Sequence, residues 1–100
     1  MYAFVALKYL APMERILKTT DRHRAYLREL HAAGKLVCSG PFVPREGGGL
    51  LLRIADASEI APLLARDPYH LEGLVSDTIY IWDPNIGREA LDLLAPAVSA

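Results

Sequence analysis

The chain has 100 residues, 52% of them hydrophobic, which is enough for one domain with its own core. Its 11 basic and 12 acidic residues give a net charge of −1, which argues against binding to nucleic acid or to an anionic membrane. The single cysteine, Cys38, excludes an internal disulfide framework and fits a reducing compartment. We expect one domain spanning residues 1–100.

The N-terminal third predicts a strand followed by a helix. Residues Met1–Tyr9 are apolar on both alternating faces, which is typical of a strand with other elements packed on each side. A proline favours a loop over residues 10–20. We expect the helix to begin at Thr20 or Asp21, either of which can cap it, and to end just before Gly34. Because no basic leader or cleavage site precedes the first strand, we expect a cytoplasmic protein.

The middle of the chain predicts a hairpin and a second helix. We expect strands at Lys35–Phe42 and Gly49–Ala55, joined by a glycine-rich loop over residues 43–48. The second helix is expected to start at a cap on Ser58. It should end at Asp67, because the residue before a proline avoids the α region.

The last third predicts a strand at Val75–Trp82 and a helix at about Ile86–Leu94. The whole order is βαββαβ with a C-terminal helix, which predicts an α+β, ferredoxin-like fold with a four-stranded antiparallel sheet and both main helices on one face. The other face would still carry Leu51, Tyr80 and Trp82. Since a bare apolar face promotes aggregation, we expect a second copy to cover it, giving a homodimer through the sheet faces.

Two ionisable side chains stand in unusual places. His23 lies in the expected first turn of the first helix, whose positive end would keep the imidazole neutral and able to accept a proton. Asp67 lies at the expected negative end of the second helix, where a carboxylate is misplaced unless it has a partner. One interpretation is catalytic: Asp67 orients the His23 ring, which removes a proton from substrate. The other is structural, with His23 padding the helix and Asp67 capping the following turn.

Other polar residues offer weaker candidates. Ser39 stands at a strand end, where side chains often line a cleft, and Arg22 and Arg24 could hold an anionic group. We expect His31 at the solvent edge, whereas His70 could join the cleft.

Several common kinds of site are not expected. The scattered histidines have no spacing that favours a metal ion, so no metal or other cofactor is expected. Cys38 is expected to be a buried, inert thiol. RNA-recognition motifs share the βαββαβ order, but the predicted third strand carries no aromatic residue on which a base could stack.

Three segments taken together resemble the YciI-like (YCII-related) family. They read His23-x-x-Tyr26-Leu27-x-x-Leu30-x-x-x-Gly34-Lys35-Leu36, then Ser39-Gly40-Pro41-Phe42, then Ala65-Arg66-Asp67-Pro68-Tyr69. The match extends from the first strand to the region of Trp82. The resemblance implies a dimeric α+β barrel with a cleft near the dimer interface.

The resemblance also implies an activity, with His23 and Asp67 as the catalytic pair. We expect a cofactor-independent lyase or isomerase that acts on a small, polar, cyclic substrate. It would be similar to an enzyme that dehydrochlorinates a chlorinated hydroxyquinol, or to a muconolactone isomerase. The alternative is a non-catalytic protein that binds a small molecule, or a dimeric accessory protein. The residues expected to bind substrate are Ser39, Gly40, Pro41, Arg22 and Tyr69.

The chain departs from the family pattern at two positions. Many members carry an arginine three residues before the histidine, where this chain has Thr20. Many also carry an acidic residue directly after the first strand, where this chain has Leu10-Ala11-Pro12. Because both positions belong to the presumed substrate end of the site, Arg22 or Arg24 would have to compensate.

Overall fold

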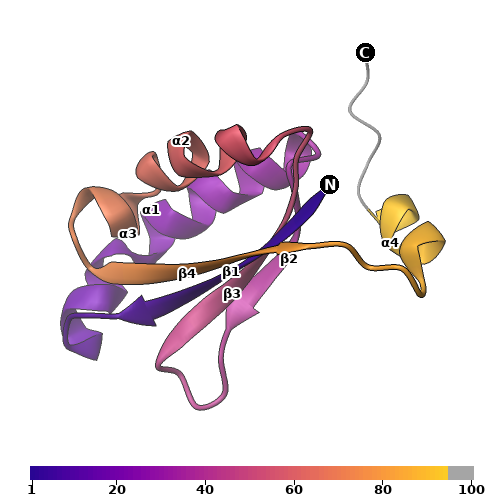
Figure 1. Ribbon diagram of the computed structural model, residues 1–100. Coiled ribbons are helices and arrows are strands. Elements are labelled where there is room, and N and C mark those ends of the chain that lie inside the picture. Colours follow the sequence, from indigo (N-terminus) through magenta and orange to yellow (C-terminus); the bar gives the residue numbers. More distant parts are fainter. Residues whose placement is uncertain (95–100) are drawn as a thin grey trace.

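A computed structural model of the chain describes residues 1–94, and residues 95–100 of the expected domain lie outside this range. The elements follow the expected βαββαβ order with a terminal helix (Figure 1). They are β1 (Tyr2–Tyr9), α1 (Met13–Ala32), β2 (Leu36–Pro41), β3 (Gly47–Arg53), the short 3-10 helix η1 (Ala57–Glu59), α2 (Ile60–Ala65), α3 (Pro68–Leu71), β4 (Val75–Trp82) and α4 (Arg88–Leu94).

The strands form one antiparallel sheet in the order β2-β3-β1-β4. The helices α1, α2 and α3 lie together on one face of this sheet, and α4 lies apart from them beyond the end of β4 (Figure 1). This arrangement confirms the predicted ferredoxin-like α+β fold. None of the helices within residues 1–94 is both long enough and apolar enough to cross a membrane.

The core lies between the sheet and the three helices that cover it. Alternate residues of β1, namely Ala3, Val5 and Leu7, are buried on the helix side, as the period of a strand requires. Helix α1 contributes residues spaced three or four apart, including Ile16 and Leu27. Each such side chain contributes about 1.5–3 kcal/mol when fully buried, so this layer holds α1 firmly against the sheet.

Helix α1 begins at Met13, so the predicted loop over residues 10–20 was wrong. Pro12 precedes the helix as its N-cap residue, and its carbonyl accepts hydrogen bonds from the backbone N–H groups of Arg15 and Ile16. A proline in this position does not interrupt the helix that follows it. The other end was predicted correctly, because Gly34 takes the left-handed conformation, with φ of 77°, just after the helix.

The predicted second helix is divided into η1 and α2, and an additional short helix, α3, follows it. Asp56 rather than Ser58 is the cap, because its carboxylate accepts the backbone N–H of Ser58 at the start of η1. Helix α2 ends at Ala65, and α3 starts at Pro68 with Asp67 as its N-cap residue. The residue before a proline avoids the α region, so the chain leaves one helix and begins another at this point.

Strand β3 starts at Gly47, so Gly47 and Gly48 belong to it rather than to the predicted loop over residues 43–48, together with Gly49, which was predicted in the strand. None of them has positive φ, so conformational freedom does not explain them. A Cβ atom built on Gly47 would lie 1.8 Å from the backbone oxygen of Leu7, and one on Gly49 would lie 2.9 Å from the ring of Phe4. The absence of a side chain therefore allows β3 to lie close beside β1.

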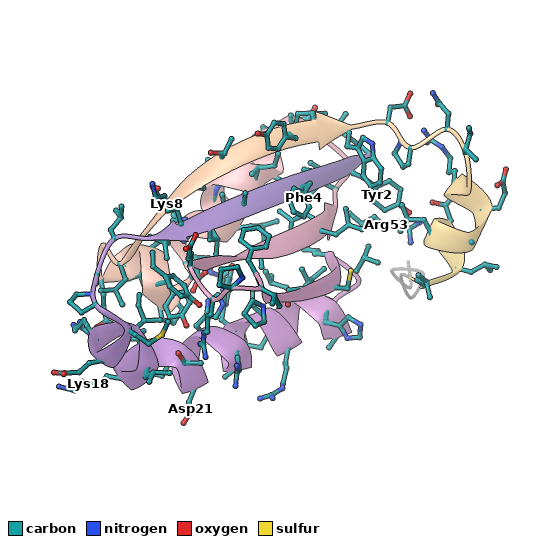
Figure 2. All side chains as sticks on the ribbon, turned by 90° about the horizontal axis from the view of Figure 1, so that it is seen from below. Tyr2, Phe4, Lys8, Lys18, Asp21 and Arg53 are labelled. Carbon is teal, nitrogen blue, oxygen red and sulfur yellow. The ribbon has the colours of Figure 1, made fainter. Side chains whose placement is uncertain are left out.

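The terminal helix α4 contacts one end of the sheet, on the face opposite to α1. Tyr2 reaches toward α4 (Figure 2), and its hydroxyl donates a hydrogen bond of 2.5 Å to Asp92. Leu91 packs against a small cluster formed by Tyr2 and Val37. On the neighbouring strand β4, Trp82 pairs with Tyr2 and Tyr80 pairs with Phe4, and both Trp82 and Tyr80 stay about half exposed.

Candidate functional site

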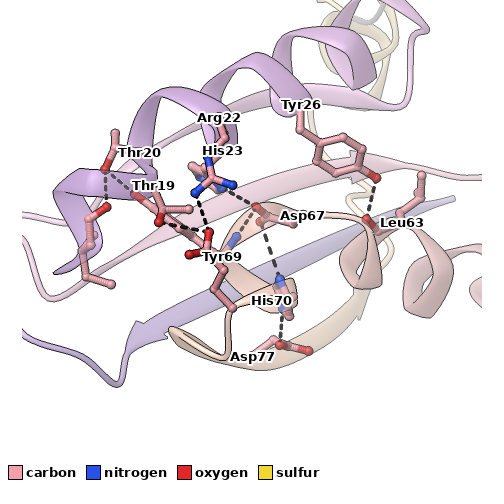
Figure 3. A network of polar contacts seen from close by, with 12 residues as sticks. Thr19, Thr20, Arg22, His23, Tyr26, Leu63, Asp67, Tyr69, His70 and Asp77 are labelled. Carbon is pink, nitrogen blue, oxygen red and sulfur yellow. Dashed lines mark hydrogen bonds and ion pairs between the residues drawn. The ribbon is translucent and has the colours of Figure 1, made fainter.

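His23 and Asp67 form a direct hydrogen bond although 44 residues separate them in sequence. The distance between His23 Nδ1 and Asp67 Oδ1 is 2.7 Å (Figure 3). An ionised carboxylate can only accept, so Nδ1 must carry the proton. In the neutral ring, Nε2 is then the nitrogen that can accept a proton from a ligand.

The two residues meet because of packing rather than because of helix dipoles. His23 lies in the middle of α1 on its buried face, not in the first turn, so the predicted influence of the helix N-terminus was wrong. Asp67 lies before α3 rather than at the end of α2, and its Oδ1 also accepts the backbone N–H of Tyr69 at 3.0 Å. The capping role and the contact with the imidazole, expected as alternatives, therefore exist together.

Asp67 is the buried centre of a row of ionisable groups that extends to the surface at Asp77. Burial raises the pKa of this carboxyl, but the interaction with His23, the nearby His70 ring and the backbone N–H of Tyr69 outweigh burial and leave the pKa lowered. Its second oxygen, Oδ2, lies 3.6 Å from Nδ1 of His70, and Nε2 of His70 lies 2.5 Å from Oδ1 of Asp77 on β4 (Figure 3). The Asp67 carboxylate, with Asp77 adding to its effect, raises the pKa of His70.

Tyr69 holds the other side of the histidine. Its ring stacks on the imidazole of His23, with centroids 3.8 Å apart and planes inclined by 12°. The hydroxyl of Thr20 donates to the carbonyl of Ile16 at 2.9 Å, so the Tyr69 hydroxyl, 2.7 Å away, is the donor to Thr20. The ring of His23 is thus fixed by a carboxylate at its edge and by an aromatic ring on its face.

A cavity of about 430 Å³ opens beside His23, between α1 and the β2–β3 end of the sheet. This volume is in the range of small-molecule sites. Its apolar wall comes from the leucine side chains of Leu7, Leu27, Leu36 and Leu50. Among its polar wall residues are His23 and Ser39, so a bound molecule can contact the imidazole directly.

The cavity includes most but not all of the residues predicted to bind substrate. Ser39, Gly40, Pro41 and Tyr69 line it. Arg22 does not line it, and instead forms an exposed ion pair of 2.8 Å with Glu72. Asp67 is 1% exposed and lies behind the imidazole, where it can act only through His23.

Sequence reasoning missed part of the cavity wall. Arg28 and Arg45 line it, and His31, expected only at the solvent edge, faces it as well. Arg45 belongs to the β2–β3 connection, where no periodic pattern indicates the direction of a side chain. Cys38 is exposed and lines the cavity, so the prediction of a buried thiol was wrong. Over residues 1–94, no three metal-binding side chains gather closely enough to hold an ion.

Comparison with known proteins identifies relatives of this chain. The YCII-related domain family matches residues 2–82. Nine chains of solved structures are similar, among them 5-chloro-2-hydroxyhydroquinone dehydrochlorinase (TftG) from Burkholderia phenoliruptrix AC1100, in complex with 2,5-dihydroxybenzoquinone. The two chains share 20% identity with a TM-score of 0.72 over 83% of this chain and 94% of that one, which shows a common fold. No curated protein shows significant similarity.

Proposed function

This chain belongs to the YCII-related family, and on that premise we propose that it is a cofactor-independent enzyme of lyase or isomerase type. In this proposal, a small, polar, cyclic substrate binds in the cavity beside α1. His23 is the general base, Asp67 is the residue that positions it, and Ser39 offers a hydrogen bond to the substrate.

The observation that carries the proposal is the state of the His23 ring. Asp67 accepts from Nδ1, the His23 residue is only 8% exposed, and it lines the cavity. These facts leave Nε2 as the proton acceptor for a bound molecule. When Nε2 takes a proton, the ring becomes an imidazolium beside a buried carboxylate, which stabilises it. A base held in this way is typically worth about 10²–10⁴-fold in rate.

Both candidate reaction types follow from one proton transfer. In a dehydrochlorination, His23 takes the proton, the bonding electron pair forms a new double bond, and chloride leaves with its own pair. In an isomerisation, the proton that His23 removes from one carbon returns to another. Neither reaction changes the overall oxidation state, so neither requires an electron carrier. The name of the dehydrochlorinase of similar fold makes the first type the natural one to test.

The alternative function is binding without catalysis, as in a ligand-binding or accessory protein. The buried Asp67 and the stacked Tyr69 favour the catalytic interpretation, because a ligand site does not need the tautomer of one imidazole to be fixed. A binding protein would hold the same molecules and leave their covalent structure unchanged.

The experiment is to incubate the purified chain with 5-chloro-2-hydroxyhydroquinone. Chloride release is measured with an electrode, and exchange of the ring protons in D₂O is measured by NMR. The proposal expects at least one reaction in the native chain and a loss of about 10²-fold or more in His23→Gln. Arg22→Gln is the matched control, because Arg22 is on the same helix but outside the cavity. Binding of 2,5-dihydroxybenzoquinone with neither reaction would support the binding protein instead.

We also propose that the chain forms a homodimer through the sheet face opposite α1, and that it works in the cytoplasm. Phe4 pairs with Leu51 on one side and with Tyr80 on the other, so these residues form a continuous apolar row. Tyr80 is 57% exposed and Trp82 is 48% exposed. A second copy is the simplest cover for such a face, since two-fold pairing matches the row with itself. Light scattering at micromolar concentration tests the dimer.

A further inference from the structure

We propose that the molecule bound beside His23 is an organic anion, namely a small carboxylate with an apolar body. The inference rests on the proposed function, because it names the substrate class for the same cavity. It begins from the charge of the cavity wall. Three arginines, Arg24, Arg28 and Arg45, and two histidines line the cavity, and among residues 1–94 no aspartate or glutamate does.

This imbalance is unusual for a chain with 12 acidic and 11 basic residues. Two nearby carboxylates, Asp67 and Glu72, do not line the cavity. Asp67 lies behind the imidazole of His23, and Glu72 forms ion pairs with Arg15 and Arg22 outside the cavity. Within residues 1–94, none of the three arginines that line the cavity forms an ion pair with a carboxylate, so no such pair neutralises their positive charge.

Arg24 and Arg28 form one wall of the cavity. They are four residues apart on α1, so their side chains are neighbours on the helix surface, and two like charges at this spacing destabilise a helix. Within residues 1–94, neither forms an ion pair with a carboxylate. An anionic ligand between α1 and the sheet would relieve this repulsion.

Arg45 forms part of the facing wall, from the β2–β3 connection. It is half-buried, and its Nε donates a hydrogen bond of 3.2 Å to the hydroxyl of Tyr9. A guanidinium held in place loses little entropy when it binds, and its planar fork matches the two oxygens of a carboxylate. Arg45 therefore offers a positioned cation on the wall opposite α1.

The remaining wall indicates what else the ligand carries. Four leucines line the cavity, so part of the molecule is apolar. A ligand that is anionic at one end and apolar elsewhere satisfies both kinds of wall. The arginines also have a chemical role: when His23 removes a proton, the electron pair left on the substrate adds negative charge, which nearby guanidinium groups stabilise.

The test is a binding titration followed by NMR, with benzoate as the probe. Benzamide is the neutral molecule of the same shape, and acetate is the carboxylate without the apolar body. We expect benzoate to shift the backbone resonances of Ser39 and Gly40 and to bind at least tenfold more tightly than either control. Its affinity should fall as salt is added, because a partly exposed charge pair is screened.

Variants distinguish the effect of the cavity arginines on benzoate binding from that of an arginine outside the cavity. Arg45→Gln, and separately Arg28→Gln, should weaken benzoate binding about tenfold, which corresponds to about 1.4 kcal/mol. Arg22→Gln should leave it within twofold, because Arg22 lies outside the cavity. Equal affinity for benzamide and benzoate, or equal affinity of Arg45→Gln and the native chain for benzoate, would overturn the inference.

The same titration distinguishes this inference from the proposed function. Benzoate binding should persist in His23→Gln, which removes the base and leaves the arginines in place. Arginine-dependent binding of benzoate by a chain that catalyses no reaction would refute the proposed function and support the anion site. Turnover of a neutral ring compound without any preference for anions would support the proposed function and refute the anion site.

Discussion

Replacing Asp67 with asparagine isolates the charge that stands behind the His23 ring. In the native structure, Oδ1 accepts from both His23 Nδ1 and the backbone N–H of Tyr69. The amide oxygen of asparagine can take the same place, since asparagine is as good an N-cap residue as aspartate. The amide NH₂ would then point toward His70, whose Nδ1 lacks a hydrogen-bond partner. The tautomer of His23 is kept, and the negative charge is removed.

The expected loss of activity follows from Coulomb's law. Two unit charges about 4 Å apart interact by about 4 kcal/mol at the effective dielectric constant of 20 that suits protein sites. This is an upper limit for what Asp67 contributes when His23 becomes an imidazolium. Since each 1.36 kcal/mol is tenfold in rate, Asp67→Asn should slow the reaction by about 10²–10³-fold. The cost in stability should be only about 1 kcal/mol, because both hydrogen bonds survive in neutral form.

Asp67→Ala provides the comparison. It removes the cap of α3, at about 1 kcal/mol, and leaves His23 Nδ1 buried without a partner, at about 1–3 kcal/mol, so urea melts should show a loss of about 2–4 kcal/mol. The ring would also lose its fixed tautomer, which ¹⁵N NMR of the imidazole detects. Chloride release gives the rates of both variants. A rate for Asp67→Asn within threefold of the native rate would refute the reasoning, since the carboxylate charge would then have no part in catalysis.

Three further predictions concern pH, packing and assembly. The Asp67 carboxylate raises the pKa of His70 in the folded chain. The stability that protonated His70 contributes is therefore complete below the ordinary histidine pKa of about 6.5, and it is lost as the pH rises through the raised pKa. In urea melts, the difference between the native chain and His70→Gln should therefore shrink from pH 6 to pH 9, and growth with pH would contradict this. Gly47→Ala forces a Cβ against a backbone oxygen of β1 and should lower the free energy of unfolding by about 1–3 kcal/mol. Gly40→Ala, where the new Cβ meets no atom within 4 Å, should lower it less, and equal losses in the two variants would contradict this prediction. Tyr80→Lys places a charge on the apolar face of the sheet and should turn the proposed dimer into a monomer in light scattering, unless the face is not the interface.

The sequence alone was sufficient for the order of elements and for the fold. A strand can be recognised from a few residues, because the two-residue period of its side chains is local. For this reason the predicted bounds of β1 and β4 agree almost to the residue with those of the structure. Gly34 marked the end of α1 because only glycine adopts its backbone conformation at no steric cost. The start of α1 was missed, since its first buried positions include the polar residues Thr19 and Thr20, which break the apolar pattern.

The site required the tertiary structure. The sequence selected His23 and Asp67, partly for wrong electrostatic reasons, but their contact depends on how α1 packs against the break between α2 and α3. No local pattern encodes that register, because it is set by interlocking side chains from distant parts of the chain.

The electrostatic character of the cavity also depends on the tertiary structure. Arg45 comes from an irregular connection, and the sequence pattern places Arg28 among the exposed residues of an amphipathic helix. Only the folded chain shows that they share a cavity, while Arg22, which lies beside His23 in sequence, points to Glu72 instead. Sequence spacing determines which side chains share a helix face or a strand face, and packing between elements determines which of these faces meet.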